Sequence, residues 1–283
     1  MTTSAPASVP CGPSCDTPSL PPVLVGALMR HHRTRARLSQ LKAGNIIETS
    51  ASRISALEMA RTALPVSSAQ ALLDAYGTPA HEIRQALALL AHSDHQHRID
   101  HFAPSPVWVD ALIAGCRSVH VYSDDPTSLS LISPAASPTP DSPGRCRMVL
   151  LLSESLLNLA YDGHPAATRL PHLVRLAEGG TFSVYLVPGQ LDAPAPLLAE
   201  YTYTAWGWSG SVADRLRRQI YVAHRRDGAP GSVCNGSGAM AERQLLQQAA
   251  RTARPLEWSL RQLRKAARAQ QQAPPATRTR RTA

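Results

Sequence analysis

The chain of 283 residues has few aromatic side chains, at 5 % of the sequence, and its only lysines are Lys42 and Lys265. Because Phe, Tyr and Trp are scarce, hydrophobic cores must rest on Leu, Val, Ile and Ala. Arginine supplies almost all of the positive charge, and the net charge is +9. An excess of positive charge favours polyanionic partners, and nucleic acid is the first candidate among them.

Long apolar runs are also missing, since no stretch of the sequence approaches the length of a membrane span. The N-terminus lacks a basic region followed by an apolar run, so we expect no export and a cytoplasmic protein. The cysteines are odd in number and widely scattered, which favours free thiols over a disulfide framework. They are Cys11, Cys15, Cys116, Cys146 and Cys234.

Signatures of catalysis are scarce as well. The sequence has no phosphate-cradling glycine loop and no Cys/His framework for a metal, so we expect no cofactor and no enzyme activity. The stretch 207–210, Gly-Trp-Ser-Gly, superficially matches a nucleophile elbow, but Ser211 stands where the closing glycine belongs. We therefore do not interpret it as a hydrolase site.

Residues 92–101 hold four histidines and two aspartates. Histidine is the commonest metal ligand, and the last two histidines would share a helix face. No cysteine lies nearby, however, and the stretch falls between two expected domains, so we interpret it as a solvated linker. A metal-dependent enzyme remains the competing hypothesis for this cluster, which consists of His92, Asp94, His95, His97, Asp100 and His101.

The most informative stretch runs from Leu38 to Glu58 and predicts two short helices joined by a tight turn. Ser39 and Ser50 can each cap a helix, because a serine hydroxyl accepts an amide two or three residues further on. Gly44 is small enough to let the second helix cross closely. The short polar face of the second helix, carrying an arginine, suits a DNA major groove.

Helical spacing predicts which side chains of this stretch point inward. Ala43 and Ile47 lie one turn apart on the first helix, and Ile54 and Leu57 face them from the second. None of the remaining side chains of the second helix needs burial. These outward residues are Ala51, Ser52, Arg53, Ser55 and Ala56.

In register, these residues resemble the helix-turn-helix of lambda-repressor-like, xenobiotic-response-element-type regulators. The resemblance implies a five-helix all-α domain over residues 22–92. Glu48 and Ala60 stand where that family usually has glycine, and the turn position often needs a positive φ. A non-glycine residue there costs about 1 kcal/mol.

The resemblance also implies a docking geometry on a DNA operator. Helix N-terminal amides and the Gln40 amide would meet the phosphate backbone, and Arg53 would make a bidentate guanine contact. Arg33, with the arginines around it, either meets phosphate or forms a solvated face. The expected DNA-binding residues are Ser39, Gln40, Ser50, Ala51, Ser52, Arg53, Ser55, Ala56 and Arg61.

Beyond the linker, short strands alternate with helices and predict an α+β domain over residues 106–270. Residues 145–270 resemble the C-terminal domain of many such regulators in high-GC Gram-positive bacteria, described as antitoxin-like and often encoded beside a small acidic partner protein. The expected organisation is a disordered arm (1–21), a helix-turn-helix domain (22–92), a linker (93–105), a partner- or ligand-sensing domain (106–270) and a basic disordered tail (271–283).

We therefore predict a DNA-binding transcriptional regulator, a repressor in type, that works as a homodimer. The apolar surface for the dimer is expected from Trp206, Trp208 and the helices around residues 245–246 and 260–263. The alternative is an antitoxin-like protein-binding module whose DNA binding is weak or lost, which Glu48 and the small outward face favour.

Overall fold

The structure is a computed structural model that describes residues 19–91, 97–102, 105–124, 146–161, 168, 170–180, 182–189, 191, 197–203, 219–224 and 231–272. Several expectations lie outside these residues. They concern residues 1–18 of the expected arm, most of the basic tail, the stretch 207–211, and the residues Cys11, Cys15, His92, Asp94, His95, Trp206 and Trp208, whereas Leu20 and Pro21 of the expected arm belong to the first helix.

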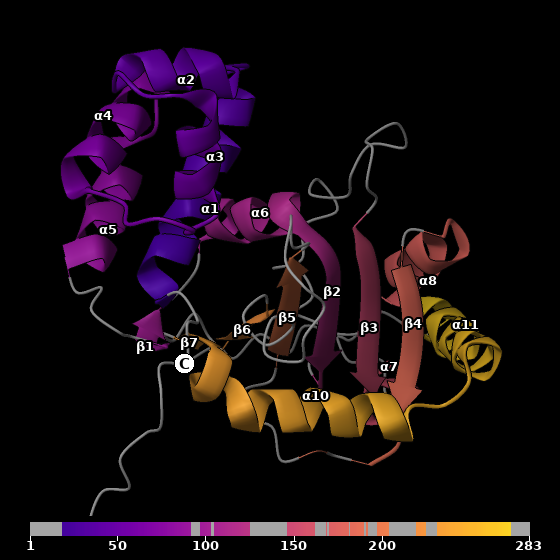
Figure 1. The fold of residues 1–283 in the computed structure, drawn as a ribbon. Helices are drawn as coiled ribbons and strands as arrows, with labels where there is room; N and C mark the ends of the chain where they lie inside the picture. Colours follow the sequence, from indigo (N-terminus) through magenta and orange to yellow (C-terminus); the bar gives the residue numbers. More distant parts are fainter. Residues whose placement is uncertain are drawn as a thin grey trace, which may run out of the picture.

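The N-terminal part is a bundle of helices, drawn in indigo and purple in Figure 1. Its long first helix lies against the third, fourth and fifth, and Ile54 and Leu73 are among the side chains buried in the bundle. Helical spacing of Leu, Ile and Ala along each segment supplies the buried face. The helices are α1 (Leu20–Arg35), α2 (Gln40–Ile46), α3 (Ala51–Glu58), α4 (Val66–Ala75) and α5 (Ala80–Ala91).

The C-terminal part is built on a mixed seven-stranded sheet in the order β1-β7-β6-β5-β2-β3-β4. Strands β2, β3 and β4 are parallel neighbours, whereas the remaining pairs are antiparallel. The strands are β1 (Arg98–Phe102), β2 (Cys116–Ser123), β3 (Arg147–Ser153), β4 (Phe182–Val187), β5 (Leu197–Tyr203), β6 (Gln219–His224) and β7 (Gly231–Asn235).

Helices cover both faces of this sheet, so its central strands are apolar on both sides. Leu150 and Val184 belong to the larger core, which helices α6, α7, α8 and α11 help to close. Leu151 belongs to a second, smaller core under α10, the orange helix across the lower end of the strands in Figure 1. The helices are α6 (Pro106–Gly115), α7 (Ser155–Tyr161), α8 (Leu170–Glu178), α10 (Met240–Thr252) and α11 (Leu256–Gln272).

The two parts share one continuous core through α1 and α6, which pack against each other. Trp108 of α6 is fully buried, and its indole Nε1 donates to the side-chain oxygen of Gln85 on α5 over 2.9 Å. Its ring also meets Phe102 edge-on, with centroids 5.7 Å apart. The helical bundle is therefore fixed to the sheet by packed side chains.

The predicted fold class, an all-α helix-turn-helix domain followed by an α+β domain, is confirmed. Three strands were not foreseen: β6, β7 and β1, which lies inside the stretch expected to be a linker. Within the described residues, no helix is both long and apolar enough to cross a membrane.

Candidate DNA-binding site

The two helices of the candidate site begin at the serines that the sequence indicated. The backbone amide of Lys42 donates to Ser39 Oγ over 3.2 Å, and the amide of Arg53 donates to Ser50 Oγ over the same distance. Each hydroxyl thus satisfies an orphan amide at a helix N-terminus. The boundaries of α2 and α3 are therefore fixed by local side-chain chemistry.

The turn between these helices is tight because Gly44 has no side chain. Its carbonyl oxygen accepts the amide of Thr49 over 2.8 Å. A Cβ at Gly44 would collide with the Thr49 carbonyl oxygen. The close crossing expected at Gly44 is present.

A buried ion pair fixes α3 to α1. The Arg33 guanidinium donates to both carboxylate oxygens of Glu58, over 2.6 and 3.0 Å, and to the carbonyl of Leu38 over 2.8 Å. The Glu58 side chain is 2 % exposed and also accepts from the Gln40 amide over 3.4 Å. Arg33 therefore joins three segments of the domain, a role that neither sequence interpretation of this arginine included.

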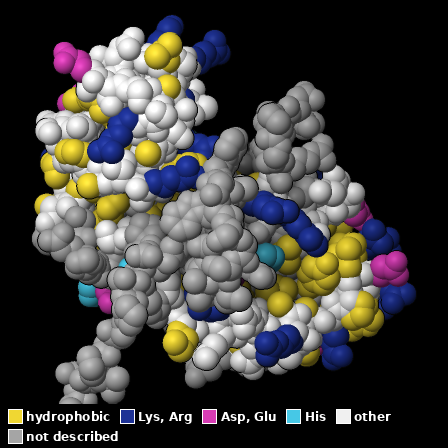
Figure 2. Space-filling model, viewed as in Figure 1, with side chains coloured by type: hydrophobic (Ala, Val, Ile, Leu, Met, Phe, Trp, Pro, Cys, Tyr) yellow, Lys and Arg dark blue, Asp and Glu magenta, His cyan; other side chains and the backbone are white. Residues whose placement is uncertain are grey.

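The inward face of α3 is as predicted, with Ile54 and Leu57 buried. On the outward face, Ser52 and Arg53 are exposed, whereas the other three side chains are half-buried. Figure 2 shows Lys and Arg side chains at the end of the bundle where Figure 1 places α2. The arrangement presents a short face of small side chains with one projecting guanidinium.

His32 of α1 lies in the interior of the bundle. It is buried, and its Nε2 lies 2.7 Å from Oε2 of the buried Glu82 on α5. Each group satisfies the polar atom of the other, as buried polar groups require. The pair contributes to the packing of the bundle and not to the exposed face of α3.

Two non-glycine residues around α3 adopt left-handed backbone. Glu48, exposed in the turn before α3, has φ 52°, and Ala60, just after α3, has φ 50°. For residues with a Cβ this conformation costs about 1–2 kcal/mol. Glu48 and Ala60, the two positions where the resemblance predicted glycine, thus adopt the left-handed backbone at a cost in free energy on either side of α3.

Glu48→Gly is expected to raise the stability of the domain by up to about 1 kcal/mol, or to raise DNA affinity, because it relieves the turn and removes a negative charge near phosphate. Ala60→Gly is the matched control, since it relieves a similar φ without changing charge. Thermal unfolding and DNA titration of both variants separate the backbone effect from the charge effect. A fall in both melting temperature and affinity of Glu48→Gly would contradict the prediction.

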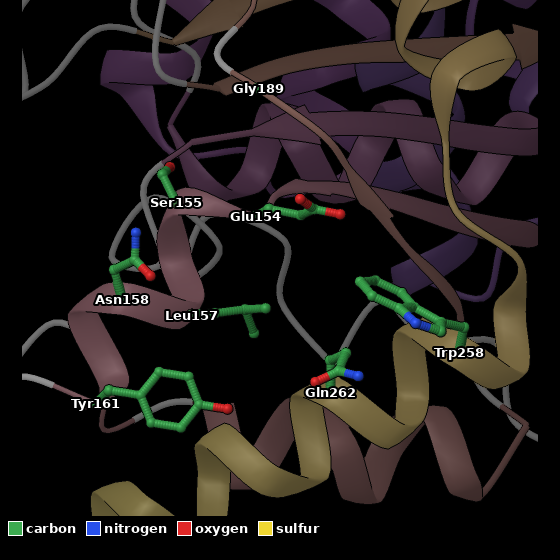
Figure 3. Close-up of a pocket in the computed structure, with 8 residues that line it drawn as sticks. All are labelled: Glu154, Ser155, Leu157, Asn158, Tyr161, Gly189, Trp258 and Gln262. Carbon is green, nitrogen blue, oxygen red and sulfur yellow. The ribbon is translucent and has the colours of Figure 1, made fainter.

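A second candidate site is a cavity of about 500 Å³ in the C-terminal part. It lies where the parallel strands β3 and β4 end, because Glu154 and Ser155 follow β3 and Gly189 follows β4. Figure 3 shows side chains of α7 facing Trp258 and Gln262 of α11 across the space. Crevices at the carboxyl ends of parallel strands are the usual ligand sites of open α/β sheets.

One side of this cavity is fixed by an ion pair. Arg254 Nε lies 3.2 Å from Glu154 Oε1, and its guanidinium stands over the Trp258 ring, 5.5 Å from the centroid. The cavity lining, which includes Glu154, Trp258 and Tyr161, is part aromatic and part hydrogen-bonding. Such a lining suits a small amphipathic molecule or a peptide side chain.

The leucines expected to offer a dimer surface are instead internal. Leu245 and Leu246 of α10 are buried in the smaller core, and Leu263 of α11 is buried in the larger one. An amphipathic helix can cover a sheet or form an interface between chains. Here the apolar faces of α10 and α11 pack into the cores of the same chain. These three leucines are therefore not available for dimer contacts.

The histidine cluster is only partly described. His97 Nδ1 lies 3.0 Å from the Asn235 side-chain oxygen, so this histidine is engaged with the end of β7. His101 is exposed and has a φ of 60°. Among the residues that the structure describes, no group of three or more His, Cys, Asp or Glu side chains is arranged to hold a metal.

Comparison with known proteins identifies the class of the N-terminal part. Residues 24–86 match a family model described as a helix-turn-helix domain, which covers α2, α3 and the helices packed around them. The N-terminal part of the chain is therefore similar to helix-turn-helix domains. No curated protein and no solved structure matches the chain significantly.

Proposed function

We propose that the chain is a sequence-specific, DNA-binding transcriptional regulator of the lambda-repressor-like type. In this proposal residues 22–92 bind an operator and residues 106–270 respond to a small partner protein or ligand. The observation that carries it is the α2–α3 unit, in which capped helices and a buried ion pair hold the exposed Arg53 side chain outward. A recognition helix needs this kind of rigid support, because base contacts depend on the position of a few side chains.

The proposed docking places α3 in the major groove. Arg53 donates to O6 and N7 of a guanine, and the small side chains beside it allow the helix to approach the base edges closely. The N-terminal end of α2, with Ser39 and Gln40, lies against phosphates. Gln40 would leave its long contact with Glu58 to do so, and Arg33 would still hold Glu58.

Arg53→Ala is expected to weaken specific binding by about 1–3 kcal/mol and to relax selectivity at one base pair. The operator is first selected from a random DNA library with the unaltered chain. Titration of every single-base variant of that operator, with both proteins, then locates the affected position. Unchanged affinity for all of these sequences after the substitution would exclude the proposed contact.

The matched control is Arg84→Ala, which removes the same charge from an exposed position on α5. This control should lower affinity for all sequences alike, through long-range electrostatics only. If neither the unaltered chain nor either variant discriminates among DNA sequences, the alternative function becomes the better one. That alternative is an antitoxin-like protein-binding module with weak or lost DNA binding.

A homodimer is part of the proposal, because one half-site seldom gives useful affinity at physiological salt. Two recognition helices about 34 Å apart would read a palindrome with half-sites one helical turn apart. The stoichiometry of the DNA titration described for Arg53→Ala tests the homodimer, and we expect two chains per operator.

The sensing role of residues 106–270 is supported by the cavity between α7 and α11 and by the packing of α6 on α1. A molecule bound at the cavity meets helices that share the larger core with the helical bundle. The net charge of +9 would also favour the small acidic protein that the antitoxin-like resemblance suggests as a partner.

A further inference from the structure

Two free thiols lie together where strands β2 and β3 begin. Cys116 is the first residue of β2, and Cys146 directly precedes β3, its parallel neighbour. Their Sγ atoms are 3.1 Å apart, although 30 positions separate them along the chain. Because the register of the two strands brings them together, the pair is a property of the folded sheet and not of local sequence.

The environments of the two thiols differ in a way that divides their roles. Cys116 is buried, and its thiol can donate to Cys146 or to the carbonyl of Ile113, 3.2 Å away. Cys146 is half-buried. The hydrogen bond from Cys116 holds the pKa of the Cys146 thiol below its ordinary value, so Cys146 is the better nucleophile of the pair.

Cys234 provides an internal comparison. It is also a free thiol, but it is buried under α10, and burial raises its pKa to about 12. Its sulfur contacts the Tyr221 carbonyl at 3.8 Å. A buried, protonated thiol reacts slowly with oxidants.

We propose that Cys116 and Cys146 form a dithiol site that is oxidised by hydroperoxides to a reversible disulfide. In the first step the Cys146 thiolate attacks one peroxide oxygen and the O–O bond breaks. The products are a sulfenic acid and the leaving anion, which is hydroxide from hydrogen peroxide and alkoxide from an organic hydroperoxide. In the second step the Cys116 sulfur attacks the sulfenic sulfur, an S–S bond forms, and water leaves. Two electrons pass from the two sulfurs to one peroxide, and a dithiol reductant returns both thiols.

The position of the site gives this modification a route to the rest of the molecule. Cys116 directly follows α6, the helix that packs on α1 of the helix-turn-helix domain. The last turn of α6 is also held by the Tyr203 hydroxyl, which donates to the Leu112 carbonyl over 3.0 Å. A bond formed at Cys116 therefore acts directly on the end of the helix that joins the two parts of the chain.

The test uses the full chain, reduced and then treated with a small excess of hydrogen peroxide at neutral pH. Trypsin cuts after Arg98, Arg117, Arg145 and Arg147, so the disulfide links peptide 99–117 to the dipeptide 146–147. Mass spectrometry under non-reducing conditions should show this linked pair as the main disulfide product, and dithiothreitol should abolish it. After the same treatment in urea, the linked pair should no longer be the main disulfide product, because unfolding separates the two thiols.

Matched variants complete the test. Cys234→Ser should form the linked pair as the unaltered chain does, whereas Cys116→Ser should accumulate sulfenic acid at Cys146 that a dimedone probe traps. Cys146→Ser should lose at least about tenfold in the rate of peroxide consumption. Scrambled disulfides in the folded chain, or equal peroxide consumption by Cys146→Ser, would overturn the proposal. Neither result depends on DNA binding, so the proposed function is tested separately.

Discussion

Replacing Arg33 by alanine is expected to lower the free energy of unfolding by about 3–5 kcal/mol. The substitution leaves the Glu58 carboxylate, whose side chain is 2 % exposed, without the guanidinium that donates to both of its oxygens. It also removes the donor to the Leu38 carbonyl. An uncompensated buried charge is costly, and chemical denaturation with urea measures the loss.

The control for this prediction is Arg35→Ala, two positions further along the same helix, where the side chain is exposed. Its effect should stay within about 0.5 kcal/mol. The double variant Arg33→Ala with Glu58→Leu removes the charge together with its partner and should recover much of the stability. If Arg33→Ala costs less than the control, the ion pair does not hold α3 to α1.

Trp108→Ala is expected to lower the free energy of unfolding by about 3–5 kcal/mol, because it empties a fully buried site between the helical bundle and the sheet. The substitution also leaves the Gln85 side chain without its indole donor and removes the edge-on contact with Phe102. Since the site belongs to both parts of the chain, the loss should appear in the unfolding of both. Hydrogen exchange of the backbone amides of the helical bundle and of the sheet strands follows the two parts separately.

Trp258→Ala serves as the comparison, because Trp258 is half-buried on α11 and its ring is covered by Arg254. Trp258→Ala should lower the free energy of unfolding clearly less than Trp108→Ala does. Trp108→Phe keeps most of the ring but not the N–H, so it should cost about 1–3 kcal/mol through the unsatisfied Gln85 oxygen. If the helical bundle of Trp108→Ala unfolds alone, at a lower denaturant concentration than the sheet, Trp108 joins the two parts less tightly than the packing indicates.

The helix-turn-helix could be predicted from the sequence because its determinants are local. Ser39 and Ser50 cap helices that begin one residue later, and Ile54 and Leu57 are separated by one turn of a single helix. Gly44 contacts Thr49, only five positions away. All of these relations fall within the range over which periodicity and capping patterns are informative.

Features that depend on distant parts of the chain were missed. Strand β1 is mostly exposed and carries Arg98 and Asp100, so its sequence does not alternate clearly, and only pairing with β7 makes it a strand. Arg33 and Glu58 are 25 positions apart, and nothing in either local sequence indicates that they meet. The amino-acid composition shows that charged residues are present, but it does not indicate which of them form ion pairs.

The separation of the two faces of α3 also bears on how the proposed regulator could change the DNA sequence that it binds. Support for the helix comes from Ile54, Leu57 and Glu58, while base reading is assigned to the opposite side. Random substitution at the exposed positions Ser52 and Arg53 should therefore yield libraries in which most members still fold. New operator preferences could accumulate there step by step, without the loss of stability that limits change elsewhere in the chain.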